Sequence, residues 1–142
     1  MAIVIAFDFG LKRTGVAVGN TLTGSASPEC TLQSQNEKPD WLNISRLFDE
    51  WKPDQLVVGL PIELDGSKNP LEKPINRFCN QLNGRYNLPV DQENEQFTSI
   101  EAAARLKQLR QSGRKKKVSK EDVDKIAASI ILENWMQNKG YR

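Results

Sequence analysis

Asp8 is a carboxylate inside an apolar segment, and such a group needs a partner. Its neighbours from Ile3 to Phe9 are all apolar, in the sequence IVIAFDF. Burying an unpaired charge is costly, so a backbone cap, a basic side chain or a bound cation must compensate it. Two roles for Asp8 therefore stand side by side: a metal ligand, and a cap for the turn at Gly10.

Asp124 repeats this pattern in the last predicted helix. Steps of three, four, seven and eleven residues from it reach apolar side chains, so Asp124 is expected on the apolar face. The residues reached are Ala127, Ala128, Ile131 and Trp135. Asp122 lies about 200° away around the helix and is explained as a helix cap. For Asp124 we favour a functional role over the alternative, an acid favoured by the helix dipole.

Three further acids lie on the fifth predicted strand. They are Asp91, Glu93 and Glu95, and the residues between them are neutral. Periodicity alone does not choose among the three, and a solvated edge face is the alternative to any role in a site.

Carboxylates in a chain without histidine point to metal-ion chemistry. The absence of histidine excludes Ser-His-Asp triads, Cys-His pairs and His-ligated zinc. Mg²⁺ prefers hard oxygen ligands, and two such ions about 4 Å apart can activate a water and stabilise the leaving oxygen of a phosphodiester. Acids brought together here would therefore support phosphodiester hydrolysis without a protein base.

The charge of the chain is unevenly distributed, which favours a polyanionic partner. Residues 1–100 carry 9 basic and 13 acidic side chains, whereas residues 101–142 carry 11 basic and 5 acidic ones. Separate positive charges can bind successive phosphates of a nucleic acid. The residues assigned to this role are Lys12, Arg13, Arg114, Lys115, Lys116 and Lys117. A solvated loop for the basic run, and ordinary turn charges for the first two residues, remain alternatives.

The elements that must position these acids follow from hydrophobic periodicity and from capping residues. They are strands at residues 3–9, 14–18 and 28–33, a helix at 40–51, a strand at 55–60, a helix at 70–85, a strand at 88–95, and helices at 99–112 and 120–137. The first two strands form an antiparallel hairpin. A hairpin followed by alternating helices and strands predicts a three-layer α/β domain.

The length and the N-terminal segment bound the organisation of the chain. The 142 residues favour one domain over residues 1–142. The segment MAIVIAFDFG has no basic n-region and is interrupted by Asp8 long before membrane-spanning length, so a cytoplasmic location without a membrane partner is expected. Cys30 and Cys79 are expected to be ordinary thiols. The oligomeric state stays open between monomer and homodimer.

Four blocks of the sequence resemble the YqgF family, also called RuvX-like. The blocks are FDFGLKRTGVAVG, VVGLPIELDGS, ENEQFTSIEAAARL and VDKIAASIILENW. They occur in the order and spacing of the family and cover nearly the whole chain. The resemblance implies an RNase H-like fold, with a mixed five-stranded sheet, an N-terminal antiparallel hairpin and helices on both faces.

The resemblance also implies a hydrolase, a Mg²⁺- or Mn²⁺-dependent nuclease. Its motifs assign the metal-binding and catalytic acids to Asp8, Glu95 and Asp124, which resolves the choice on the fifth strand. The implied activity is processing of the 5′ end of pre-16S rRNA in ribosome biogenesis. The alternative is a Holliday junction resolvase acting on branched DNA.

One departure from the family bears on catalysis. The family usually has Asp-Glu-Arg where this chain has Asn94-Glu95-Gln96, which weakens the expected support around the acid. A non-catalytic nucleic-acid-binding module is therefore a competing hypothesis. An actin- or Hsp70-like ATPase is another, because the first block also resembles the phosphate loop of those folds.

The loop after the fourth predicted strand is expected to border the substrate. Asp65 and Ser67 lie in this loop. Ligands of α/β sheets commonly bind beyond the carboxyl ends of strands. A plain Asp-Gly turn is the alternative.

Overall fold

The computed structural model describes residues 2–61, 69–95, 102, 104–105, 107–108 and 119–141. Its elements, in chain order, are β1 (Ile3–Asp8), β2 (Arg13–Asn20), β3 (Ser25–Gln33), α1 (Trp41–Trp51), β4 (Gln55–Pro61), α2 (Glu72–Tyr86), β5 (Val90–Glu95) and α4 (Lys120–Asn138). The predicted helix at residues 99–112 lies mostly outside the described residues, and the five of its residues that are described are helical.

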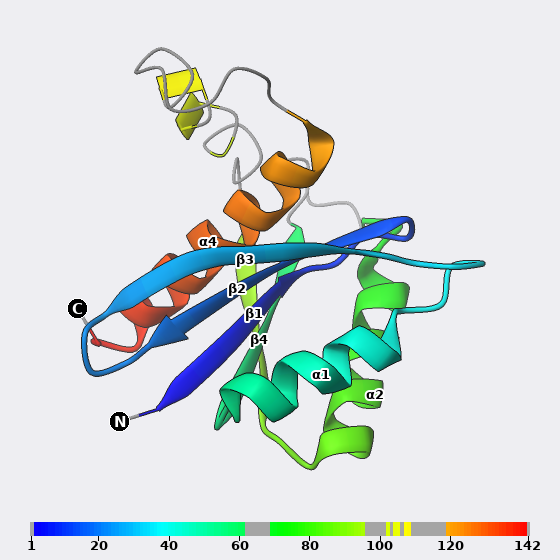
Figure 1. The fold of residues 1–142 in the computed structure, drawn as a ribbon, viewed down its shortest axis with the longest axis horizontal. Coiled ribbons are helices and arrows are strands. Elements are labelled where there is room, and N and C mark those ends of the chain that lie inside the picture. Colours follow the sequence, from blue (N-terminus) through cyan, green and yellow to red (C-terminus); the bar gives the residue numbers. More distant parts are fainter. Residues whose placement is uncertain are drawn as a thin grey trace.

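The strands form one mixed sheet in the order β3-β2-β1-β4-β5 (Figure 1). β2 pairs antiparallel with β1 and β3, which confirms the predicted N-terminal hairpin. β4 runs parallel to β1 and β5. The carboxyl ends of β1, β4 and β5 therefore meet at one edge of the sheet.

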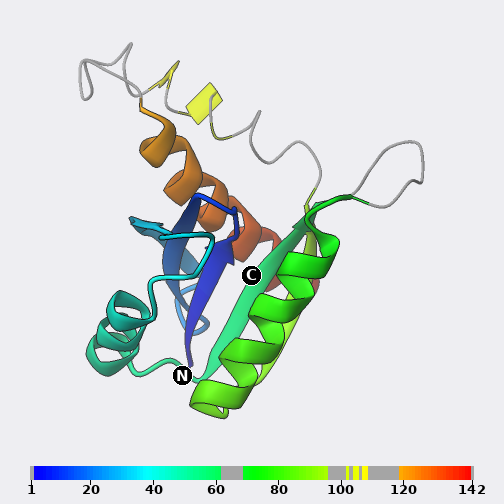
Figure 2. The same ribbon diagram turned by 90° about the vertical axis from the view of Figure 1, so that its right-hand side faces the viewer.

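Helices cover both faces of this sheet, as predicted (Figure 2). Side chains of β1 alternate between the faces. Ile5 and Phe7 pack in a core with residues of α1 and α2. Val4 and Ala6 pack instead against α4. The inner strands β1, β2 and β4 are buried on both faces, which explains the apolar runs in their sequences.

The last helix is buried around most of its circumference, which the sequence pattern did not predict. The sheet covers one side of α4, and Ala102 packs with Ile126, Ala127 and Ile130 on another side. The apolar stripe through Asp124 therefore does not by itself distinguish an inner from an outer face.

Several predicted boundaries were wrong by one to three residues, and the starts of β3 and α2 differ for an identifiable reason. β3 begins at Ser25 rather than at Pro28, because it pairs with β2 along its whole length, with a register shift opposite Val16/Ala17. Proline is tolerated there because β3 is an edge strand. α2 begins at Glu72 rather than at Pro70, because Asn69 accepts hydrogen bonds from two following backbone N–H groups and forms a turn before the helix.

The predicted caps of two helices are confirmed. The side chain of Asp40 accepts a hydrogen bond from the N–H of Asn43 at the start of α1. Ser119 and Asp122 form a reciprocal capping box at the start of α4. None of the helices in the described part of the chain is long and apolar enough to cross a membrane.

Candidate active site

Asp8 and Glu95 end two strands whose carboxyl ends lie at the same edge of the sheet. Asp8 is the last residue of β1 and Glu95 the last of β5, with β4 running between them and parallel to both. Asp8 lies on the same face as Val4 and Ala6, which pack against α4. The edge next to the N-terminal half of α4 is therefore where carboxylates can collect.

The three acids of β5 all face α4, but two of them are already engaged. Trp135 donates a hydrogen bond from Nε1 to Asp91 Oδ2 at 3.0 Å, and Asn138 donates one from Nδ2 to Glu93 Oε2 at 2.7 Å. Glu95 differs, because its buried Oε2 accepts no hydrogen bond from any residue that the structure describes. Of the three, Glu95 is the acid left available for a ligand.

Gly59 of β4 makes room for the Glu95 side chain. A Cβ atom at Gly59 would lie 2.7 Å from Glu95 Oε2 and 2.5 Å from Ile131 Cδ1. The Glu95 carboxylate therefore lies over the strand that separates it from β1. A glycine inside a strand often marks such a close approach.

Gly15 of β2 does the same for the third acid. Gly15 is the cross-strand partner of Asp8, and a Cβ atom there would lie 2.0 Å from the carbonyl oxygen of Asp124. The backbone of α4 therefore rests directly on the strand beside Asp8. Glu121 anchors the same turn of the helix, since it accepts hydrogen bonds from Thr31 Oγ1 at 2.7 Å and Gln33 Nε2 at 2.9 Å.

The collected carboxylates disfavour one another's charge. Burial raises the pKa of Asp8 well above its ordinary value, and the charges of Glu95 and Asp124 raise it further. Burial also raises the pKa of Glu95 to about 7. Such an accumulation of acids is typical of sites that bind a cation or move protons.

Asp124 has a partner that the sequence did not assign to it. Arg13 Nε donates to Asp124 Oδ2 at 2.8 Å, across 111 positions of the chain. In the described part of the chain no three acidic or cysteine side chains form a ready-made ligand set for one ion. Because Arg13 occupies Oδ2 of Asp124, this carboxylate can bind a metal through Oδ1, or through Oδ2 in exchange for Arg13.

A hollow of about 270 Å³ opens at this edge of the sheet. It is lined by Asp8, Phe9, Gly10, Leu11, Lys12, Arg13, Leu71 and Asp124. The structure therefore brings Lys12 and Arg13 to the same hollow as two of the predicted acids. Asp65 and Ser67, and the basic residues Arg114, Lys115, Lys116 and Lys117, lie outside the described residues.

The departure at Asn94 lies away from the acids. Asn94 is exposed, and strand alternation puts its side chain on the opposite face of β5 from Glu95. Gln96 lies outside the described residues. The sequence reasoning missed Gly15 and Gly59, although glycines inside apolar strands are a recognisable signal of close packing.

Comparison with known proteins gives matches over almost the whole chain. A family model described as "RuvX: Holliday junction resolvase" matches residues 2–138. A relative from Hydrogenovibrio crunogenus, named "Putative pre-16S rRNA nuclease", is 48% identical over 134 residues, which is 94% of this chain and 92% of the relative. A relative of the same name from Pseudomonas putida is 39% identical over 137 residues, 96% of each chain.

Two solved resolvases share the fold. Thermus thermophilus RuvC in complex with a Holliday junction aligns with a TM-score of 0.55 and 14% identity, covering 99% of this chain and 98% of that one. The fowlpox virus resolvase in complex with Holliday junction DNA aligns with a TM-score of 0.59 and 17% identity, covering 97% and 99%. These likenesses confirm the RNase H-like fold predicted above.

Proposed function

The chain belongs to the RuvX family, and on that premise we propose that it is a divalent-metal-dependent nuclease that hydrolyses phosphodiester bonds in pre-16S rRNA. One observation carries the proposal. Carboxylates from β1, β5 and α4 gather at one edge of the sheet, where burial and mutual repulsion raise the pKa of Asp8. A bound cation would stabilise their ionised forms.

The donor atoms fit Mg²⁺ or Mn²⁺. Asp8, Glu95 and Asp124 offer carboxylate oxygens, the hard ligands that these ions prefer. The buried Oε2 of Glu95 has no hydrogen-bond partner among the described residues, so a ligand can take it without breaking a bond. The bound metal would supply Lewis-acid stabilisation of the developing charge and lower the pKa of a water.

The two basic residues of the hollow, Lys12 and Arg13, are proposed to orient the substrate. Lys12 and Arg13 line it together with Asp8 and Asp124, so they place positive charge where a phosphate would lie. Arg13 would bind that phosphate once a cation replaces it at Asp124. The backbone contact at Gly15 would keep Asp124 beside Asp8 during this exchange.

Other parts of the proposal rest on the sequence. Residues 114–117 would bind the nucleic-acid backbone farther from the hollow, because separate positive charges suit successive phosphates. Asp65 and Ser67 would border the substrate. Residues 1–142 would form one nuclease domain, and the two free cysteines agree with a cytoplasmic location.

The names of the relatives favour RNA over branched DNA as the natural substrate. The relatives that are 39% and 48% identical carry the pre-16S rRNA name, whereas the resolvases bound to DNA junctions are below 20% identity. Branched DNA stays the second candidate, because the matching family model is described as a Holliday junction resolvase.

Asp8→Asn tests the proposal. We expect this variant to keep the fold, measured by circular dichroism, and to lose Mg²⁺- and Mn²⁺-dependent cleavage of both a pre-16S rRNA fragment and a four-way DNA junction. Asp49→Asn makes the same chemical change at an exposed position of α1 and should cleave like the wild type. Equal cleavage by Asp8→Asn and wild type, purified identically, would refute the assignment.

The same experiment separates catalysis from binding alone. Binding that persists in EDTA, with no cleavage of either substrate in Mg²⁺ or Mn²⁺, would favour the non-catalytic nucleic-acid-binding module. Detectable binding of ATP by the wild type would reopen the ATPase hypothesis.

A further inference from the structure

A second hollow adjoins the one that contains Asp8. It has a volume of about 360 Å³ and shares Phe9 and Leu11 with the first hollow. Its other lining residues are Glu37, Lys38, Pro39, Pro74, Arg77, Phe78 and Gln81. Together the lining residues come from the β1–β2 turn, the connection between β3 and α1, and α2, which come together at one end of the molecule (Figure 1).

The second hollow combines an apolar floor with a positively charged rim. Leu11, Pro39 and Pro74, which are at least partly exposed, form the apolar floor over the buried rings of Phe9 and Phe78. Lys38 and Arg77 supply the cations, against Glu37 as the one acid among the lining residues. Neither Lys38 nor Arg77 is ion-paired within the described part of the chain, whereas Arg13 is paired with an acid.

We propose that this second hollow binds a single-stranded stretch of nucleic acid directly beside the phosphodiester that is cleaved, an inference that rests on the proposed nuclease function. Apolar surface suits the faces of a base and a ribose, and cations on the rim suit the phosphates on either side. A volume of this size accepts one small ligand group at a time. Bases in a duplex are stacked on their neighbours, so only an unpaired nucleotide can occupy the hollow.

We place the end of the bound single strand near Lys38, where the second hollow meets a third one. A third hollow of about 470 Å³ shares Lys38 and Pro39 with the second and contains Trp41. That indole is already covered, because the Arg85 guanidinium lies 4.1 Å from its ring centroid and Phe78 stacks at 5.8 Å. Trp41 is therefore already engaged by side chains of the protein, and we do not assign it to a further base.

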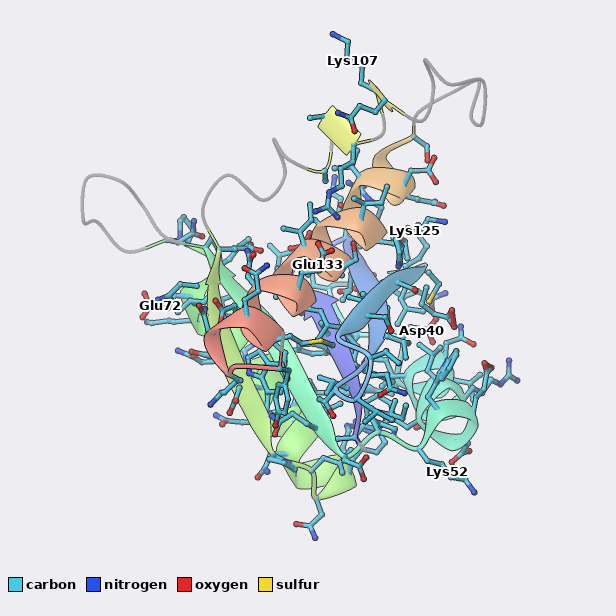
Figure 3. All side chains as sticks on the ribbon, turned by 90° about the vertical axis from the view of Figure 1, so that its left-hand side faces the viewer. Asp40, Lys52, Glu72, Lys107, Lys125 and Glu133 are labelled. Carbon is cyan, nitrogen blue, oxygen red and sulfur yellow. The ribbon has the colours of Figure 1, made fainter. Side chains whose placement is uncertain are left out.

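The test removes the two rim cations and measures binding without cleavage. The double variant Lys38→Gln/Arg77→Gln is compared with wild type by fluorescence anisotropy in EDTA. The probes are a blunt RNA duplex and two extended versions of it, one with a single-stranded 5′ extension and one with a single-stranded 3′ extension. The matched control is Arg46→Gln/Lys52→Gln, which removes the same number of positive charges from α1 and its C-cap. Lys52 lies at the far end of α1 from Asp40 (Figure 3).

We expect the rim variant to bind one of the extended duplexes about tenfold more weakly than wild type at physiological salt, which corresponds to two lost phosphate contacts. The slope of log affinity against log salt concentration should fall by about 1.4, or about 0.7 for each contact with a single strand. Affinity for the blunt duplex should stay unchanged, and the control variant should bind all probes like the wild type.

The inference is overturned if the rim variant binds both extended duplexes like the wild type, or if the blunt duplex and the control variant show the same loss. The first result would mean that the two rim cations do not contact the nucleic acid. The second would mean that binding depends on the overall surface charge and not on this hollow. Because the assay contains no metal and no cleavage, a failure here leaves the nuclease proposal standing. The opposite outcome is also distinguishable. If the wild type cleaves nothing but the rim variant loses binding to an extended duplex, the proposal for the second hollow stands and only the nuclease proposal fails.

Discussion

Replacing Glu95 with glutamine is expected to stabilise the metal-free protein at about pH 8, although it removes a proposed metal ligand. Burial raises the pKa of Glu95 to about 7, from an ordinary value of 4.5. Between these two values the unfolded chain releases the proton while the folded chain retains it. Rising pH therefore favours unfolding in this interval, and the loss of stability levels off above the folded pKa.

The magnitude follows from that shift. A difference between about 4.5 and about 7 corresponds to about 3 kcal/mol at pH 8, at 1.36 kcal/mol for each pKa unit. Glutamine cannot ionise, so it recovers part of this cost, while its buried amide remains as poorly hydrogen-bonded as the Oε2 that it replaces. We expect a net gain of about 1–3 kcal/mol, which raises the melting temperature of a chain of this size by about 3–10 °C.

The assay is thermal unfolding of wild type and Glu95→Gln in EDTA at about pH 5 and about pH 8. The gain should be present at the higher pH and mostly lost at the lower one, because pH 5 is close to the unfolded-state pKa of 4.5 and little of the pH-dependent cost has accumulated there. Glu50→Gln, at an exposed position of α1, should change stability by less than about 0.5 kcal/mol at both. A lower melting temperature for Glu95→Gln at the higher pH would refute the electrostatic reasoning.

Three further substitutions test the geometry of the site. Gly15→Ala should cost about 3 kcal/mol or more in chemical denaturation, because its Cβ would meet the rigid backbone at Asp124, and a near-neutral result would contradict that contact. Gly59→Ala should cost less stability, about 1–2 kcal/mol, because its Cβ would meet the flexible ends of side chains. The same substitution should slow cleavage about 100-fold, because it displaces Glu95. Unchanged cleavage would mean that Glu95 is not positioned by Gly59. Arg13→Gln should tighten Mn²⁺ binding about twofold to fivefold in calorimetry, since it frees Asp124 from a partly exposed ion pair, and weaker binding would show that the pair does not compete with the ion.

Gly84→Ala is the control for both glycine substitutions. Gly84 lies in α2, and apart from its chain neighbours and the adjacent helix backbone no atom of the described residues lies within 4 Å of the position that a Cβ would take. Alanine has the higher helix propensity, so this variant should gain up to about 1 kcal/mol and cleave like the wild type.

Local periodicity and residue chemistry were sufficient to predict the hairpin, the order of the elements and the helix caps at Asp40 and Ser119. They also identified Asp8, because a carboxylate in an apolar strand requires a partner whatever the fold. The absence of histidine then directed attention to metal ions. These inferences depend on near neighbours in the chain, so the sequence alone determined them.

The relations between distant segments required the tertiary structure. Asp91, Glu93 and Glu95 have the same period and the same face, and only the packing of α4 shows that the first two are bonded to Trp135 and Asn138. Resemblance to a family had singled out Glu95, but the residues of the strand could not. A strand pattern specifies which face a side chain lies on and does not specify what packs opposite it.

The same limit applies to Arg13 and to the second hollow. Arg13 looks like a free turn cation in the sequence, and its ion pair with Asp124 joins residues 111 positions apart. Lys38 and Arg77 carry no signal in the sequence, because they gain significance only where two loops and a helix meet. The sequence therefore determined which chemical groups the chain offers, and the fold decided which of them meet, since convergence depends on packing between segments that local patterns do not encode.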